Sequence, residues 1–237
     1  MLILNGDLTT YMGVYEQENI ETLETLMENV IYDNPLNMEE TILHHKEGVD
    51  LIPSNLELSG MEVTLANAMS RECIMKNVIQ DIKQSYDYIL IDCMPSLGML
   101  TINALACSDK IIIPVQSQYF AAKGMGHLLK TVSKVRKNIN PELQVGGMIL
   151  TLVDKRTNLA KDIRSELKEN YGSIVNIYNT EIPLAIKTAE STSSGKSIFE
   201  YDKNSSVAKA YNEFAEEVLK QDVKERKQNA LAKGYER

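Results

Sequence analysis

The sequence predicts an α/β protein in which a doubly wound, mostly parallel sheet carries helices on both faces. From residue 87 onward, apolar segments of strand length alternate with longer segments of helical pattern, and short connections join them. The strand segments, such as KIIIPV at 110–115, are nearly continuous apolar runs, which is typical of strands covered on both faces. Alternation with short connections indicates right-handed crossovers between parallel strands.

Composition sets broad limits on the function. The chain has 237 residues, 43% hydrophobic and 24% charged, which is enough for one large domain with a full core. A net charge of -8 argues against a protein that coats nucleic acid by bulk charge, although a local basic patch is compatible with it. Three cysteines without metal-ligand spacing, and no signal peptide or membrane-length apolar run, predict a protein of the reducing cytoplasm.

The elements before residue 87 are predicted from local patterns. A strand at 2–4 is followed by an acidic segment, 16–40, whose apolar residues recur at helical spacing and predict an amphipathic surface helix. A strand near 49–55 stops at Pro53, and Ser54 or Asn55 is placed to cap the next helix. Two further helices are expected over 56–68 and 71–84.

The second part of the chain gives the alternating pattern. Strands are expected over 87–92, 110–115, 144–153 and near 174–178, and helices over 98–107, 119–138, 157–170 and about 205–230. Ligands of such sheets bind beyond the carboxyl ends of the strands. Asp92, Pro114 and Asp154 all fall at predicted strand ends.

Asp92 ends the apolar run in DYILIDCMPSLG (87–98), and its spacing fits two interpretations about equally well. In one, the carboxylate caps the following turn or helix. In the other, it is a Walker-B-type acid that holds a magnesium ion near the phosphates of a nucleotide. The second interpretation requires a phosphate-binding loop. The nearest match to G-x-x-x-x-G-K-[ST] is ESTSSGKS (190–197), where Glu190 replaces the first glycine, so we interpret it as a polar surface loop.

Several longer blocks carry a family resemblance. They are GDLTTYMG (6–13), VDLIPSNLELSGMEV (49–63), DYILIDCMPSLGMLTINAL (87–105), KIIIPVQSQYFAAKGMGHLLKTV (110–132), GGMILTLVDKRTNLAKDI (146–163) and GKSIFEYDKNSSVAKAYNEFAEEVL (195–219). In order and spacing, residues 6–219 resemble the ParA/Soj partition ATPases, a deviant-Walker group of P-loop NTPases related to MinD.

The resemblance implies a single domain over residues 1–219 that lacks the family's first strand, K-G-G-x-G-K-T-type phosphate loop and following helix, because Met1 to Asn5 align inside the second strand. ATP and Mg²⁺ are the cofactors that it implies, and their binding by this chain is in doubt without that loop. Residues 220–237 are expected to form a helical or frayed tail. This tail has no large apolar face for a membrane.

The resemblance also assigns site residues. Asp92 would be the magnesium-side acid, and Pro95, Ser96 and Gly98 would form the switch-II turn, in which Met94 replaces a usual proline. Thr151, Asp154 and Pro183 would lie near the base. Their alternative is that they are ordinary strand-end and turn residues.

DNA binding without sequence preference is a further implication, through phosphate contacts on the surface of an ATP-bound homodimer. The candidate contacts are Arg156, Lys161, Arg164, Lys187 and Lys196. Leu184 stands where the family usually has an arginine, and Lys187 keeps a charge without the bidentate fork. The alternative is that these cations only solvate the surface.

The sequence is therefore compatible with two functions. The first is a plasmid or chromosome partition protein of the ParA type, a nucleotide-switched dimer that works with a ParB-like adaptor and lies in the cytoplasm or on the nucleoid. The second is a non-catalytic relative or gene remnant that acts only through protein contacts. A chain without the first strand is also expected to leave a sheet edge or face uncovered.

Overall fold

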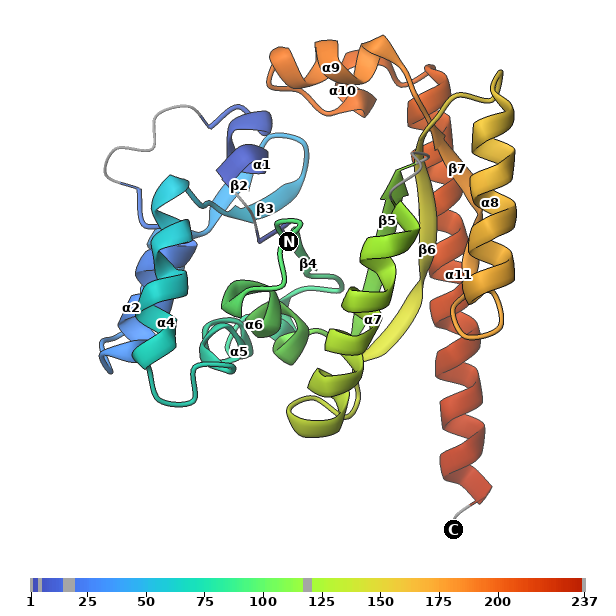
Figure 1. Cartoon of the computed structure of the whole chain (residues 1–237). Coiled ribbons are helices and arrows are strands. Elements are labelled where there is room, and N and C mark those ends of the chain that lie inside the picture. The colour runs from blue at the N-terminus through green and yellow to red at the C-terminus, as the bar shows by residue number, and fades with distance from the viewer. Residues whose placement is uncertain (1, 4–5, 15–19, 117–120, 236–237) are drawn as a thin grey trace.

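The structure is a computed structural model that describes residues 2–3, 6–14, 20–116 and 121–235. Figure 1 shows two halves, one built from the segments before residue 108 and one from the segments after it. Each half contains its own sheet. The α/β class predicted from the sequence is confirmed, but the strands form two hydrogen-bonded sheets rather than one.

The first sheet has the strand order β2-β3-β1-β4. Its strands are β1 (Leu2–Ile3), β2 (Leu43–His45), β3 (Val49–Ile52) and β4 (Leu90–Ile91). β1 pairs in parallel with β3 and with β4, while β2 and β3 form an antiparallel hairpin. The hairpin was not predicted. Its turn is closed by Gly48 at φ 79, where the amide donates to the carbonyl of His45 at 2.9 Å.

The second sheet has the order β5-β6-β7 and is entirely parallel. Its strands are β5 (Lys110–Gln116), β6 (Gln144–Val153) and β7 (Ile177–Pro183). β5 and β6 match the prediction, while β7 lies further along the chain than the expected strand near 174–178. β6 has a bulge next to Gly147, whose φ of 158 is rare for other residues. A Cβ at Gly147 would also meet the ring of Tyr178 at 2.7 Å.

The helices largely follow the predicted segments. They are α1 (Gly6–Tyr11), α2 (Leu23–Ile31), α3 (Met38–Thr41), α4 (Met61–Asn67), α5 (Ile74–Gln80), α6 (Met99–Cys107), α7 (Ala121–Asn138), α8 (Asn158–Tyr171), α9 (Ile186–Ser193), α10 (Ile198–Asp202) and α11 (Ser206–Tyr235), with short 3-10 turns at Leu56–Gly60 and Lys83–Ser85. Of the helix predicted over 16–40, residues 16–19 lie outside the described ranges, and the rest contains α2 and α3 instead of one helix. Asn34 and Pro35 lie between these two helices, because the residue before a proline disfavours helical backbone. α11 continues without a break past residue 219. No helix in the described ranges combines the length and apolar character needed to cross a bilayer.

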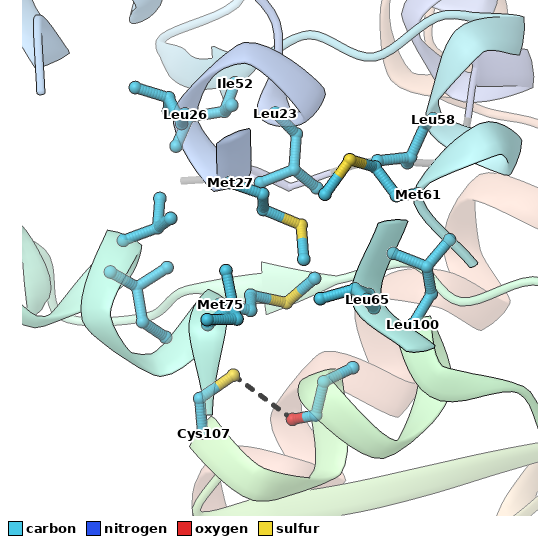
Figure 2. Close-up of a cluster of buried hydrophobic side chains, with 14 of the residues drawn as sticks. Leu23, Leu26, Met27, Ile52, Leu58, Met61, Leu65, Met75, Leu100 and Cys107 are labelled. Carbon is cyan, nitrogen blue, oxygen red and sulfur yellow. Dashed lines mark hydrogen bonds between the residues drawn. The ribbon is translucent and has the colours of Figure 1, made fainter. Parts of the chain in front are cut away.

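The first half has its core between the short helices and the sheet. Figure 2 shows side chains of α2, α4, α5 and α6 converging there. The labelled members are Leu23, Leu26, Met27, Ile52, Leu58, Met61, Leu65, Met75, Leu100 and Cys107. Four of these are methionine or cysteine, whose soft and adaptable side chains fill irregular space between short helices.

The second half buries both faces of its sheet. On one face, Ile113 of β5 and Met148 of β6 pack with Met125 of α7 and with α8. On the other, Ile149 of β6 packs with Val207 and Ala208 of α11. Covered faces of this kind explain why β5 and β6 are apolar along most of their length.

α6 is the last helix of the first half, contacts the second half, and is buried along most of its length. Toward the first half, the Asn103 side chain, which is 0% exposed, accepts from the amide of Met75 at 3.0 Å and donates to the carbonyls of Arg71 and Met99 at 2.7 and 2.9 Å. Toward the second half, Leu105 packs with Val132 of α7. One short helix therefore ties the α4–α5 region to the second sheet.

Replacing Asn103 with alanine should destabilise the protein by about 1–3 kcal/mol, because it leaves the Met75 amide and two carbonyls without their buried partner. Urea unfolding followed by circular dichroism measures this. The control is Asn138→Ala on the exposed end of α7, which should change stability by less than about 0.5 kcal/mol. Equal effects of the two substitutions would show that Asn103 is not a structural tie.

Candidate nucleotide-side site

A large cleft lies between the two sheets, and we call it the central cleft. Its volume is about 1220 Å³, and residues of β4, β5, α6, α7 and α11 line it. Asp92 follows β4 directly, is exposed, and lines this cleft together with Ser96. The carboxyl end of β4 therefore opens onto the cleft, as the strand-end rule predicts.

The turn after Asp92 is held by two short hydrogen bonds. The Ser96 amide donates to the carbonyl of Met94 at 2.7 Å, and the Thr101 hydroxyl donates to the carbonyl of Ser96, also at 2.7 Å. Pro95 and Ser96 are exposed at the tip of this turn. The proposed switch segment is thus a tight turn whose far end is fastened to α6.

Glu62 of α4 caps the start of α6, and sequence reasoning missed it. Its carboxylate accepts from the amides of Met99 and Leu100 at 2.7 and 3.2 Å. A negative group at this position also interacts favourably with the helix dipole. A Cβ on Gly98 would come within 2.3 Å of the Glu62 Oε1 atom, so a larger residue there would displace the carboxylate from the amides that it caps.

Cys93 adjoins Asp92 and faces the same environment. Neighbouring protein atoms desolvate its thiol, and the Asp92 carboxylate adds a smaller repulsion, so that the pKa of Cys93 is raised to about 11. The side chain is nevertheless partly open to solvent. A thiol with such a pKa stays protonated at neutral pH, which makes it a poor nucleophile or cluster ligand.

The residues expected near the base gather at the carboxyl ends of β6 and β7. Pro183 is in register with Val153, the residue before Asp154, and the Thr151 hydroxyl lies 3.5 Å from the carbonyl of Val115 in β5. Just before this end, Leu152 has φ 53, a left-handed conformation that is unusual for a branched side chain. The structure thus brings Thr151, Asp154 and Pro183 to one edge, whereas Asp92 belongs to the other sheet.

Asp154 and Arg156 were predicted to have separate roles, but they form one ion pair. The guanidinium donates to both carboxylate oxygens, from Nε at 2.9 Å and from Nη2 at 2.7 Å, and the Arg156 amide adds a bond at 3.0 Å. These hydrogen bonds lower the pKa of Asp154 to about 2. The bidentate donor groups of Arg156 are therefore already bonded to a carboxylate of the same loop.

Three more of the predicted DNA-contacting cations have acidic partners. Arg164 donates to Glu181 at 2.8 Å, Lys187 to Asp202, and Lys196 pairs with Glu200 at 3.1 Å. The fifth, Lys161, is exposed on α8. The structure places these cations on the α8–α10 side of the molecule but matches most of them with carboxylates, which reduces the local positive potential.

The glycine–lysine–serine segment at 195–197 is not shaped to hold phosphate. Its Ser197 amide donates to the Glu47 carboxylate at 3.1 Å, and the Ser197 hydroxyl also bonds Glu47. The same hydroxyl caps α10 by accepting from the amide of Glu200 at 3.2 Å. Since a carboxylate already occupies these donors, the segment caps α10 and does not bind phosphate. The polar surface loop expected over 190–197 is shorter than predicted, because α9 continues to Ser193.

These residues therefore fit the magnesium ion of a magnesium–nucleotide complex better than they fit its phosphates. Asp92 is a suitable magnesium-side acid, because Mg²⁺ often takes only one or two protein carboxylates and completes its shell with water and phosphate. Within the described ranges, no group of three His, Cys, Asp or Glu side chains gathers as a metal site. The amides at the start of α6 are already bonded to Glu62. These residues supply a cation-binding acid and strand ends, but no phosphate cradle.

Replacing Glu62 with alanine should cost about 0.5–2 kcal/mol in unfolding free energy, because two helix-start amides lose their acceptor. Thermal and urea unfolding report the loss. Glu166→Ala, on the exposed face of α8, is the matched control and should be nearly neutral. A Glu62 variant as stable as this control would show that water replaces the cap without penalty.

Comparison with known proteins identifies the group to which this chain is related. The AAA_31 family, described as an AAA domain, matches residues 4–145. The sporulation initiation inhibitor protein Soj of Bacillus subtilis is 38% identical over 213 residues, which cover 90% of this chain and 82% of that protein. The chromosome partitioning protein ParA of Myxococcus xanthus is 33% identical over 92% of this chain and 75% of its own length.

A solved structure gives the same relationship for the fold. Cobyrinic acid a,c-diamide synthase from Mycobacterium smegmatis, with bound ATP analogue and magnesium, superposes with a TM-score of 0.70 and 26% identity over 82% of this chain and 77% of that one. Together with the order of the strands, the switch-like turn after Asp92 and the Soj and ParA matches, this shows that the chain belongs to the AAA_31 family and, within it, to the ParA/Soj-type partition ATPases related to MinD.

Proposed function

We propose that this chain acts in plasmid or chromosome partition as a dimer whose DNA binding is switched by nucleotide. In this proposal it binds DNA without sequence preference and works with a ParB-like adaptor, in the cytoplasm and on the nucleoid. The observation that carries the proposal is the position of Asp92, at the carboxyl end of β4 and on the wall of the central cleft. The related cobyrinic acid a,c-diamide synthase has been solved with a bound ATP analogue and magnesium.

We expect these 237 residues to bind nucleotide weakly. The sequence contains no complete G-x-x-x-x-G-K-[ST] loop. Arg156, which lies beside the predicted base region, is paired with Asp154. A triphosphate would therefore find one magnesium-side acid and few donors to balance its charge.

Titration of the 237-residue protein with a fluorescent ATP analogue tests this directly. We expect millimolar or weaker binding with Mg²⁺ present, and a further loss in Asp92→Asn, which removes the metal-side charge without changing shape. Arg71→Lys, at an exposed side chain that does not line the central cleft, keeps its charge and serves as a control that should leave binding unchanged. Micromolar, magnesium-dependent binding would contradict the predicted impairment while supporting the nucleotide site.

DNA contacts are proposed on the α8–α10 side, where the carboxylates now compete with phosphate for the same cations. Asp202 holds Lys187, and its own pKa is lowered first by that hydrogen bond. Both side chains of this pair reach solvent, so the pair can open at small cost.

Asp202→Asn should strengthen DNA binding because it frees Lys187 while keeping similar hydrogen-bonding shape. Fluorescence anisotropy with a labelled random-sequence duplex measures this, and the gain should shrink as salt rises. Asp81→Asn at the end of α5 changes net charge equally at a distant place. If both substitutions raise affinity by the same factor, net charge rather than the Lys187 region is responsible.

A second candidate is a non-catalytic relative that acts only through protein contacts. The observation in its favour is the Glu62 cap, which fills the helix start nearest the switch-like turn with a fixed negative charge. Adaptor binding measured with and without ATP separates the two candidates. A nucleotide-dependent change favours the partition switch, whereas equal binding favours the contact-only role.

A further inference from the structure

α7 lies in a segment of the chain that is basic and has no acids. Residues 110–141 contain six Lys and Arg residues and no Asp or Glu. Lys130, Lys134 and Lys137 follow one another at spacings of four and three residues, which places them on one face of α7. All three are exposed, and we call them the α7 stripe. None of them is among the DNA contacts predicted from the sequence.

The opposite side of α7 is fixed to the body of the second half. Met125 packs against the β5-β6-β7 sheet. Val132 and Val135 pack in a cluster with Leu105 of α6 and with Leu143. Because this packing holds the helix in place, the three lysines project from a fixed array, which extends about 10 Å along the helix axis from Lys130 to Lys137.

The charges of the α7 stripe are not neutralised within the chain. No carboxylate in the described ranges forms an ion pair with any of its three lysines. On the α8–α10 side, by contrast, Arg156, Arg164, Lys187 and Lys196 are each paired with an acid. A polyanion that approaches the α7 stripe therefore has no carboxylate to displace.

Helix stability accounts for only part of this charge. Lys137 lies with Arg136 in the last turn of α7, where a cation interacts favourably with the helix dipole. Lys130 and Lys134 lie earlier in the helix, and like charges four residues apart destabilise a helix by about 0.2–0.5 kcal/mol. Without a paired acid, this repulsion is relieved only by counterions or by an anionic partner.

The composition of the exposed face indicates which polyanion it fits. In the described part of α7, the exposed residues are glycine, histidine, serine, asparagine and the cations, with no large apolar or aromatic side chain. Helices that lie on an anionic membrane bury an apolar face in it. Single strands of nucleic acid are bound largely by aromatic stacking. A duplex can be bound through its phosphates alone, and it carries about six of them over the roughly 10 Å of the stripe.

The distribution of charge over the two halves favours DNA on the same side. Residues 1–107 contain 17 Asp and Glu but only 4 Lys and Arg, whereas residues 108–237 contain 16 acids and 21 bases. The net charge of -8 therefore combines a strongly acidic first half with a basic second half. The first half repels a nucleic acid while the second half attracts it, which orients the duplex toward α7 and away from the first sheet.

We propose that the α7 stripe binds the phosphate backbone of duplex DNA, as a contact surface separate from the cations of α8–α10. The inference rests on the proposed function, because it assigns a surface to the DNA binding that this function includes. Since the stripe meets phosphates and no base edges, its contribution is independent of DNA sequence and decreases as salt rises.

The test uses the whole 237-residue protein and a labelled random-sequence duplex, with fluorescence anisotropy measured over a range of salt concentrations. In the triple variant Lys130→Gln, Lys134→Gln, Lys137→Gln we expect at least tenfold weaker binding at low salt. The plot of log affinity against log salt concentration should become less steep by about 2–3, because each lost phosphate contact removes about 0.9 from its slope. Circular dichroism checks that the variant is folded.

The matched control is the triple variant Lys76→Gln, Lys209→Gln, Lys220→Gln. It removes the same charge at exposed lysines of α5 and α11, and it should weaken duplex binding by less than about threefold. Equal losses in the two triple variants would overturn the assignment to α7 and leave the proposed function standing. Absence of duplex binding by the folded, unaltered protein would overturn both.

Vesicles of phosphatidylglycerol separate DNA from a membrane as the partner. We expect the unaltered protein and the α7 variant to cosediment with these vesicles to the same small extent, because the exposed face of α7 has no apolar anchor. If the α7 variant lost vesicle binding while its duplex binding stayed unchanged, the stripe would be a membrane contact and the proposal would be wrong.

Discussion

α6 has to pack on two sides at once, and both halves of the molecule depend on how this short helix is held. Its start is fixed by the Glu62 carboxylate of α4, its middle by Asn103, and its far side by contacts with α7. The helix is apolar almost all round, which is the composition expected where no face meets water. Because the switch-like turn leads directly into α6, the position of Asp92 relative to the second sheet follows from these contacts.

The sequence predicted most elements that have a strong pattern of their own. β5, β6, α7 and α8 lie close to the expected ranges, because long apolar or amphipathic segments determine their type locally. The β2–β3 hairpin was missed because three residues with two histidines carry no clear alternation. The separation of β4 from β5 follows from strand pairing, which is a property of the whole chain rather than of either segment.

In the candidate site, too, locally determined features could be predicted and long-range contacts could not. Strand-end placement of Asp92 and Asp154 could be predicted, since ligands of parallel sheets bind beyond the carboxyl ends of the strands. Pro183 was assigned only through the family resemblance, because the last strand was expected near 174–178 and β7 ends at Pro183. The partners of these residues could not. Glu62 lies 36 residues before Gly98, and Glu47 lies 150 residues before Ser197, so no local spacing indicates either contact. The ion pairs that neutralise most of the predicted basic residues likewise appear only when side chains are placed.

Hydrogen bonds outside α6 also join the two halves. The Tyr88 hydroxyl donates to Asp222 of α11 at 3.3 Å, and Ser197 at the start of α10 is bonded to Glu47 in the β2–β3 turn. Single hydrogen bonds of this kind can break and re-form one at a time, whereas the packed core around α6 resists deformation. Relative movement of the halves should therefore resemble a hinge with its axis near α6, on the microsecond-to-millisecond scale of domain motions. Such a hinge would change the width of the central cleft between β4 and β5. The hydrogen bonds of Tyr88 and Glu47 would limit how far the cleft opens.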